Sequence, residues 1–220
     1  MKWYTAIGSK KNNGRREFCV QAGKEEKVLS GMEIYIWTAL LWAFCEEEAI
    51  YGRVEKFLRI TFGEEEAEQR ICREEYAFGF RRLCTRGLIV CCEGENAEEA
   101  MMCLMRTAVL EPSRISMQER WEAFWESLKC GRGLRFSLRA FQRKPLEEKK
   151  LELLEKIRQS GDMAYHLETV QSQAGRTCFL PADDAVIEEF QETMQKEFLA
   201  DVITLYGKKF LNIYSVGKEV

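Results

Sequence analysis

Apolar side chains recur at helical spacing in the segment that follows Ser30. Glu33 comes three residues later, as in a capping box, where each side chain bonds a backbone amide that the first turn of a helix leaves unpaired. The apolar positions then lie three and four residues apart, as one face of a helix requires: Met32, Tyr35, Ile36, Ala39, Leu40, Ala43 and Phe44. The pattern predicts a helix from Ser30 to Phe44.

Two more helices are predicted before the glycine at position 87. After the polar break Glu46–Glu48, a second apolar stripe ends near Gly63; its members are Ile50, Val54, Phe57 and Leu58. A third helix is expected from about Glu65 to Arg86, with Gly87 where a C-cap glycine belongs. We expect one face of this helix to meet the core, and its members are Cys72, Tyr76, Gly79, Phe80 and Leu83.

Strand patterns are short and few. Leu88–Cys92 is an apolar run that ends at turn residues, and Phe18–Ala22 alternates weakly, so each segment predicts one strand. We expect Ser9–Arg16 to form a basic loop. Ala97–Thr107 is predicted to be a fourth helix.

The helical pattern restarts beyond Pro112, where we place a domain boundary. Further helices are predicted at Ser116–Lys129, Pro145–Ile157 and Ala182–Tyr206. Leu134–Arg143 fits a strand and a helix equally. The expected fold is therefore mainly α: a helical domain with a short strand over residues 1–112, and a helical region over residues 113–220 that ends in a long helix.

Composition supports a folded chain without an overall preference for polyanions. Of the 220 residues, 46% are hydrophobic and 31% are charged, which is enough apolar material for a core. The net charge of −3 does not favour nucleic acid over other partners. The longest apolar run, Ile34–Cys45, is shorter than a membrane span, and no export signal is seen, so we expect a cytoplasmic protein.

No pattern of catalytic, cofactor-binding or metal-binding residues is found in the sequence. The nine cysteines include no CxxC pair, which predicts structural thiols, although a redox sensor built from Cys84, Cys91 and Cys92 stays open. His166 is the single histidine, and no GxSxG, GxGxxG or P-loop motif is present. We therefore expect no enzyme activity, no cofactor and no metal.

The segment between the third helix and the following strand carries a resemblance to a known family. Its residues are Leu83, Arg86, Gly87, Leu88 and Ile89, and they resemble the end of the recognition helix in winged helix-turn-helix proteins of the broad MarR/PadR kind. The similarity covers Ser30 to about Cys92. It implies a winged-helix-like domain and a transcription regulator that inserts its third helix into the major groove of DNA.

The face of the third helix opposite the apolar stripe has a composition that suits DNA. At 100° per residue it carries Arg70, Arg73, Glu74, Ala77 and Arg81. Arginine can bind guanine or phosphate, and a small residue permits close approach. The predicted DNA-binding residues are therefore Arg70, Arg73, Ala77 and Arg81, with Arg82 and Arg86 as backbone contacts. The basic stretch Lys129–Lys144 could add further phosphate contacts.

Two acidic groups favour an alternative, a protein–protein interaction module on the same scaffold that does not bind DNA. The predicted wing strand leads into an acidic turn and then a helix, and the acidic residues there are Glu93, Glu95, Glu98 and Glu99. The third helix starts among glutamates, which would repel phosphate, and these are Glu64, Glu65, Glu66 and Glu68. A continuous basic stripe on the third helix would favour DNA, whereas a patchwork of charges would favour a protein partner.

The long last helix is apolar over a wide arc. Its members include Phe198, Leu199, Val202, Ile203, Leu205 and Tyr206. Such a helix must be covered by its own domain or by a second subunit. The sequence therefore predicts a homodimer in which this helix contributes to the interface. The alternative is that the helix lies at the centre of the core of its own domain. No effector ligand is identified from the sequence.

Overall fold

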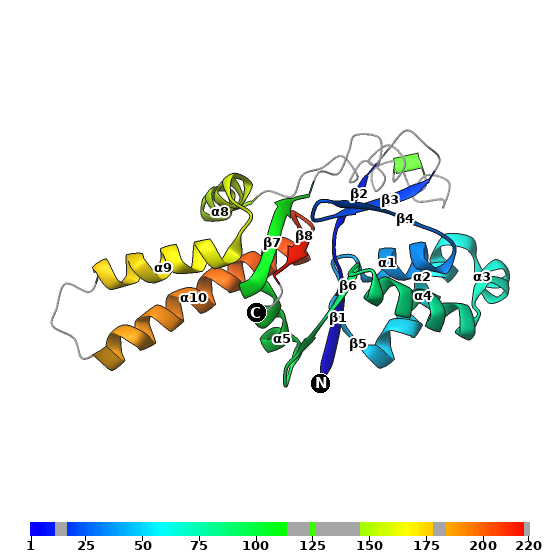
Figure 1. The fold of residues 1–220 in the computed structure, drawn as a ribbon, viewed down its shortest axis with the longest axis horizontal. Coiled ribbons are helices and arrows are strands. Elements are labelled where there is room, and N and C mark those ends of the chain that lie inside the picture. The colour runs from blue at the N-terminus through cyan, green and yellow to red at the C-terminus, as the bar shows by residue number, and fades with distance from the viewer. Residues whose placement is uncertain (12–16, 114–123, 126–145, 178–183, 218–220) are drawn as a thin grey trace.

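A computed structural model describes residues 1–11, 17–113, 124–125, 146–177 and 184–217 (Figure 1). The ambiguous stretch Leu134–Arg143 and most of the predicted helix Ser116–Lys129 lie outside the described residues. The whole basic stretch Lys129–Lys144 also lies outside them. Within the described part of the chain, no helix is long and apolar enough to cross a membrane.

The prediction of a mainly α fold is wrong, because helices are combined with three antiparallel sheets. The strands are β1 (Lys2–Ala6), β2 (Ser9–Lys11), β3 (Phe18–Ala22), β4 (Glu25–Leu29), β5 (Cys45–Glu46), β6 (Ile89–Glu93), β7 (Ala108–Pro112) and β8 (Leu211–Val216). Most of them are too short to show a clear alternation, and β2 carries two lysines. The missed β7 follows a helix without a polar break, so its pattern merges with that of the helix.

The helices match the predicted order more closely, except that the helix over Met163–Thr177 was not predicted. They are α1 (Met32–Leu40), α2 (Glu47–Phe62), α3 (Glu64–Arg70), α4 (Arg73–Thr85), α5 (Ala97–Thr107), α8 (Glu148–Gln159), α9 (Met163–Thr177) and α10 (Asp184–Gly207). The predicted third helix is two helices, α3 and α4, because Ile71 and Cys72 are extended, with ψ of 98° and 122°. Buried Ala67 and partly buried Ile71 hold this break against the core. Gly63 and Gly87 end helices at positive φ, as predicted.

The first sheet places the N-terminal strand in its centre, in the order β5-β1-β6. β1 pairs antiparallel with β6 along its whole length, from Lys2 opposite Glu93 to Ala6 opposite Ile89. The expected wing strand β6 is thus paired with β1, the first strand of the chain. It leads through an acidic turn into α5, whose Asn96 side chain accepts a hydrogen bond from Glu99 N at 2.9 Å.

The second sheet, β2-β3-β4, is built from consecutive hairpins and ends at β4. Ala22 pairs with Glu25 across a two-residue turn whose first residue, Gly23, has φ of +59°. This turn needs a positive φ at that position, which glycine adopts without strain. The third sheet, β7-β8, joins the end of the α5 segment to the C-terminal strand.

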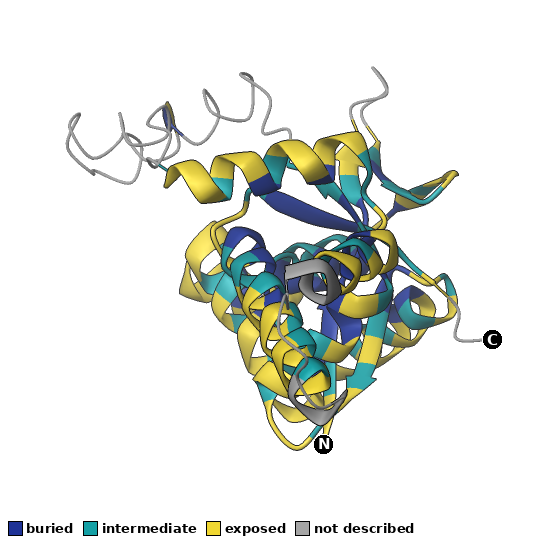
Figure 2. Cartoon of the chain, turned by 90° about the vertical axis from the view of Figure 1, so that its left-hand side faces the viewer, coloured by how far each residue is buried: buried dark blue, intermediate teal, exposed yellow. Residues whose placement is uncertain are grey.

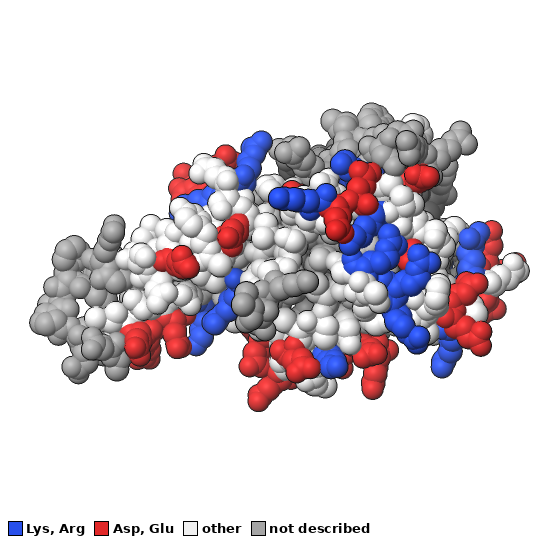
Figure 3. All heavy atoms as spheres, in the orientation of Figure 1, with Lys and Arg blue, Asp and Glu red and all other residues white. Residues whose placement is uncertain are grey.

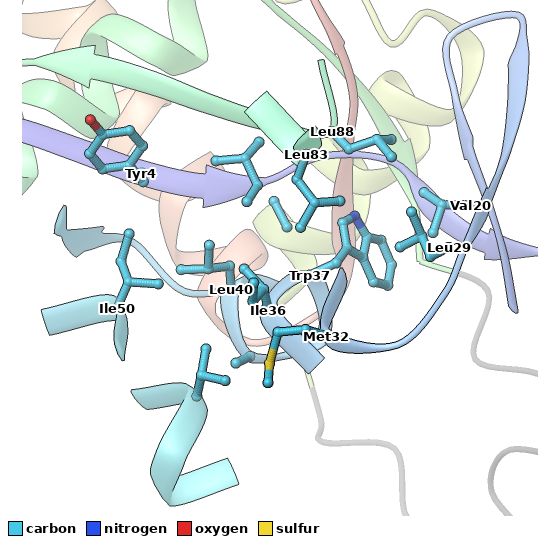
Figure 4. Close-up of a cluster of buried hydrophobic side chains, with 14 of the residues drawn as sticks. Tyr4, Val20, Leu29, Met32, Ile36, Trp37, Leu40, Ile50, Leu83 and Leu88 are labelled. Atoms are coloured by element: carbon cyan, nitrogen blue, oxygen red, sulfur yellow. The ribbon is translucent and has the colours of Figure 1, made fainter. Parts of the chain in front are cut away.

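A first hydrophobic cluster lies between α1, α2, α4 and the strands β1, β3 and β4 (Figure 4). Trp37 is only 1% exposed, and its indole Nε1 donates to Ile7 O at 2.9 Å. Its ring meets that of Phe18 edge to face, and the 5.9 Å between the ring centroids lies within the range of roughly 4.5–7 Å for such pairs. Trp37 therefore joins α1 to both the β1 segment and β3.

A second cluster forms around α10, with α5, α8, α9 and the β7-β8 sheet packed against it. Figure 1 shows α9 and α10 side by side as an antiparallel pair that points away from the first cluster. Figure 2 shows the buried positions gathered inside and the exposed ones on the outer helix faces. α5 and β7 belong to this cluster although they lie on the N-terminal side of the predicted domain boundary, within residues 1–112. The division of the chain into two domains at this boundary stays a prediction. So does the homodimer.

The two clusters meet where α1 and α10 end. Trp42 and Lys209 have φ of 57° and 66°, and they are the two non-glycine residues with positive φ among those described. Lys209 Nζ lies 5.2 Å from the centroid of the Trp42 ring, and Trp42 Nε1 donates to Leu211 O at 2.9 Å. The ends of both helices are therefore fixed to each other.

Alkaline pH should destabilise the protein because buried phenols must stay protonated. Burial raises the pKa of Tyr206 to about 12, whereas an unfolded tyrosine ionises near pH 10. The native state therefore keeps a proton that the unfolded chain loses, so stability is complete below pH 10 and falls as pH rises toward 12. Denaturant unfolding at pH 8 to 12 should show this decline.

The variant Tyr206→Phe isolates this contribution. It loses the hydrogen bond with Thr5 Oγ1, 2.8 Å long, and should be less stable at pH 7 by about 1 kcal/mol. Its decline between pH 10 and 12 should be shallower than that of the wild type. An equal slope in both proteins would show that Tyr206 does not contribute to the alkaline loss.

Candidate interaction surface on α4 and β4

α4 is held tightly against α1 by a glycine. A Cβ atom added at Gly79 would lie 3.2 Å from Ile36 Cδ1, so a larger residue would separate the two helices. Gly87 then ends α4 at φ of +63°, where Leu88 N bonds Leu83 O at 2.9 Å and Gly87 N bonds Cys84 O at 3.0 Å. This is a Schellman arrangement, and it directs the chain into β6.

The outer face of α4 mixes basic, acidic and apolar side chains. Of the predicted DNA-binding residues, Arg73, Ala77, Arg81 and Arg82 are exposed on this helix. Glu74 and Glu75 are exposed in its first turn. Phe78 is 61% exposed, which is unusual for a large aromatic side chain. The face therefore offers apolar contact area as well as charge.

Two of the predicted arginines lie beside aromatic rings. Arg70 belongs to α3 rather than to α4, and its guanidinium carbon is 4.3 Å from the centroid of the Phe62 ring. It also donates weakly to Tyr35 Oη at 3.4 Å. Arg73 lies over the ring of Tyr51 at 5.2 Å. The structure does not bring Arg70 onto the face that carries Ala77 and Arg81.

Arg82 and Arg86 converge on a buried carboxylate. The Glu33 side chain is only 4% exposed, and its Oε1 lies 3.2 Å from both Arg82 Nε and Arg86 Nη1. Its Oε2 accepts the Ser30 amide at 3.3 Å, which is one half of the predicted capping box. Arg82 is 48% exposed and stacks at 5.5 Å on Phe78. These contacts link α1 to the C-terminal half of α4.

The edge strand β4 lies against the C-terminal end of α4. Arg86 Nη2 donates to Val28 O at 2.8 Å, and Lys27 Nζ donates to Arg86 O at 2.5 Å. Val28 itself is 48% exposed. We call the area formed by Lys27, Val28, Phe78, Arg82 and Arg86 the α4–β4 surface.

The hairpin register shows which backbone groups of β4 face outward. Ala22 and Glu25 flank the two-residue turn and form a hydrogen-bonded pair, and such pairs alternate along an antiparallel ladder. The next hydrogen-bonded pairs are therefore Val20 with Lys27 and Phe18 with Leu29. Glu26 and Val28 turn their N–H and C=O groups away from β3, toward an edge with which no other strand of the described residues pairs. The contact of Arg86 with Val28 O agrees with this register.

Charge around the α4–β4 surface is a patchwork. Figure 3 shows Lys and Arg atoms gathered over α4 and β4, with Asp and Glu atoms on either side. Lys27 is paired with Glu25 at 2.9 Å, and Lys11 with Glu26 at 3.3 Å. The arrangement lacks the continuous basic stripe that would favour a DNA duplex.

Of the three thiols in the possible redox sensor, Cys84 and Cys92 are partly buried and Cys91 is exposed. Burial raises the pKa of Cys84 to about 11, with a smaller contribution from nearby Cys91. Because the thiolate is the reactive form, such a thiol reacts slowly near neutral pH. Burial and a hydrogen bond to Glu47, 3.0 Å long, raise the pKa of the neighbouring Tyr4 as well. Among the described residues, no group of histidine, cysteine or acidic side chains could hold a metal ion.

Sequence reasoning missed the acceptors and apolar contacts of this surface. Glu33 was recognised only as a helix-capping residue, and Val28 and Phe78 were not singled out. Phe78 was detectable, since it lies between Ala77 and Gly79 off the apolar stripe. No family model, curated protein or solved structure matches the chain.

Proposed function

We propose that the chain is a protein-interaction module whose α4–β4 surface binds an extended segment of another protein. One observation carries the proposal: the edge of β4 that no described strand pairs with contacts Arg86. Arg86 shares the Glu33 carboxylate with Arg82, and Arg82 lies over the ring of exposed Phe78. An added strand gains backbone hydrogen bonds from such an edge, and neighbouring side chains select its sequence.

The scaffold supports this proposal through its arrangement of elements. The order α1, β5, α2, α3, α4 and β6 is consistent with a winged-helix-like module that has one additional short helix, α3, and in which β1 takes the place of the second wing strand. A DNA-binding wing would offer a basic hairpin at this point. Instead, β6 runs into the turn around Glu95, where phosphate would be repelled.

The charges on the surface suit a partner with acidic and apolar side chains. The Arg82 side chain is about half exposed and its guanidinium stacks on the Phe78 ring, which adds exposed aromatic area. Arginine and aromatic residues dominate the energy of many protein interfaces. Glu74 and Glu75 limit the approach of a nucleic-acid backbone at the start of α4.

Sequence-specific DNA binding is the second candidate, and one observation favours it. Arg73, Ala77 and Arg81 are spaced by four residues and are all exposed, so they share one face of α4. In this mode, replacing Arg73 and Arg81 by alanine should cost roughly 1–3 kcal/mol for each lost base contact.

Two titrations distinguish these functions. The first measures binding of a random-sequence DNA duplex at low salt, and the second measures binding of peptides selected on the protein from a random displayed library. We expect peptide binding to fall by roughly ten- to a hundredfold in Phe78→Ala, as for a central interface aromatic, and to be nearly unchanged in the Arg73→Ala, Arg81→Ala double variant. Salt-sensitive duplex binding that only the double variant abolishes would establish the DNA-binding function instead.

A further inference from the structure

The free edge of β4 is already covered at one point. Val28 O is one of the backbone acceptors that an added strand would use, and it is occupied by Arg86 Nη2 at 2.8 Å. The same guanidinium contacts Glu33 through Nη1, and Lys27 Nζ holds the backbone carbonyl of Arg86. A strand cannot pair with β4 along its whole length while Arg86 stays in this position.

Charged side chains often protect edge strands from unwanted pairing. Here the protecting side chain comes from a helix rather than from the strand itself. It is 25% exposed, so a partner can reach it from solvent. Glu33 keeps a second cation, because Arg82 Nε lies 3.2 Å from its Oε1. Arg86 can therefore leave Val28 without leaving the buried carboxylate unpaired.

We infer that Arg86 blocks the β4 edge in the unbound protein and is displaced by a partner segment that offers it a carboxylate. This inference rests on the proposed function, since it concerns partner choice at the same surface. A carboxylate can accept two parallel hydrogen bonds from a guanidinium, which are stronger than one bond to a neutral carbonyl. A neutral segment would offer Arg86 only neutral carbonyl acceptors in place of Val28 O.

Arg86 thus determines which segments bind. Acidic segments exchange one Arg86 contact for a stronger one, whereas neutral segments gain no stronger contact in return for displacing Arg86. If Arg86 is replaced by methionine, its apolar stem stays similar in length but Val28 O becomes free. Neutral segments should then bind, and the preference for acidic ones should disappear.

The test is a selection of short random displayed peptides on the wild type, on Arg86→Met and on Arg86→Lys. Arg106→Met is the matched control, because Arg106 is an exposed basic residue on α5. Circular dichroism confirms that each variant is folded, and the lysine variant keeps the positive charge beside Glu33. Each variant's pool is sequenced, and one acidic peptide is compared with its Glu→Gln copy on every protein.

Wild type and Arg106→Met should enrich acidic residues and prefer the acidic peptide by about tenfold. Arg86→Met should enrich peptides without that bias and bind both copies equally, and Arg86→Lys should show a reduced preference. Equal acidic enrichment on wild type and Arg86→Met would overturn the role of Arg86 and leave the interaction surface standing. Absence of peptide enrichment on every protein would overturn the proposed function, and this inference with it.

Discussion

Replacing Trp37 with alanine should lower the free energy of unfolding by roughly 3–5 kcal/mol, the range for deleting a large buried aromatic. The ring fills the first hydrophobic cluster, where Trp37 is 1% exposed. Its loss also leaves Ile7 O without its indole donor and removes the edge-to-face contact with Phe18. Few substitutions in this chain should cost more.

Denaturant unfolding measures this effect directly, and Phe78→Ala is the matched control. Phe78 is a large aromatic as well, but it is 61% exposed, so its removal should change stability by about 0.5 kcal/mol or less. A loss of less than about 1 kcal/mol in Trp37→Ala would contradict the core described here.

Replacing Glu33 with alanine should have the second-largest effect, a loss of about 2 kcal/mol. The carboxylate is buried, and its removal leaves Arg82 and Arg86 facing each other without a counter-charge. It also frees the Ser30 amide at the start of α1. Both arginines remain partly solvated, so the expected loss is below that of a fully buried pair.

Glu33→Gln separates the charge from the hydrogen bonds. The amide oxygen can still accept from Ser30 N, so this variant should retain part of the stability that the alanine variant loses. Thermal and denaturant unfolding of both variants give the comparison. Equal stability of Glu33→Ala and the wild type would show that the Arg82–Glu33–Arg86 cluster does not stabilise the junction of α1 and α4.

Helices of this chain could be predicted well because their signals are local. The apolar stripe that begins at Met32 predicted α1, which ends at Leu40, before the predicted end at Phe44. The glycines at 63 and 87 marked two helix ends correctly. Helix α5 was predicted with the same bounds, Ala97–Thr107. In each case the periodicity and the ending residue lie within the element itself.

The sheets could not be predicted as readily because their partners are distant. β1 pairs with β6 across more than eighty positions, from Ala6 opposite Ile89 to Lys2 opposite Glu93, and neither strand carries a turn that identifies the other. The break between α3 and α4 was missed because Cys72 was taken as the first member of the apolar stripe, whereas its backbone is extended and its side chain is exposed. Tertiary contacts of Ala67 and Ile71 outweigh local helix propensity there.

The candidate site was only partly accessible from sequence for a similar reason. Arg82 and Arg86 were identified from their positions at the end of the predicted helix. Their shared acceptor Glu33 lies about fifty residues away, and the neighbouring Val28 carbonyl belongs to a strand that was not predicted. Local spacing identifies the donors of such a cluster, whereas the fold supplies the acceptors.

The most direct test of the interaction surface is a nuclear magnetic resonance titration of the labelled protein with a selected peptide. The account predicts that amide signals of Glu26, Val28 and the residues around Phe78 and Arg82 shift together and saturate at one equivalent. Signals of α9 and α10, which lie away from this surface, should stay in place (Figure 1). Shifts confined to α9 and α10, with the β4 and α4 signals unchanged, would contradict it.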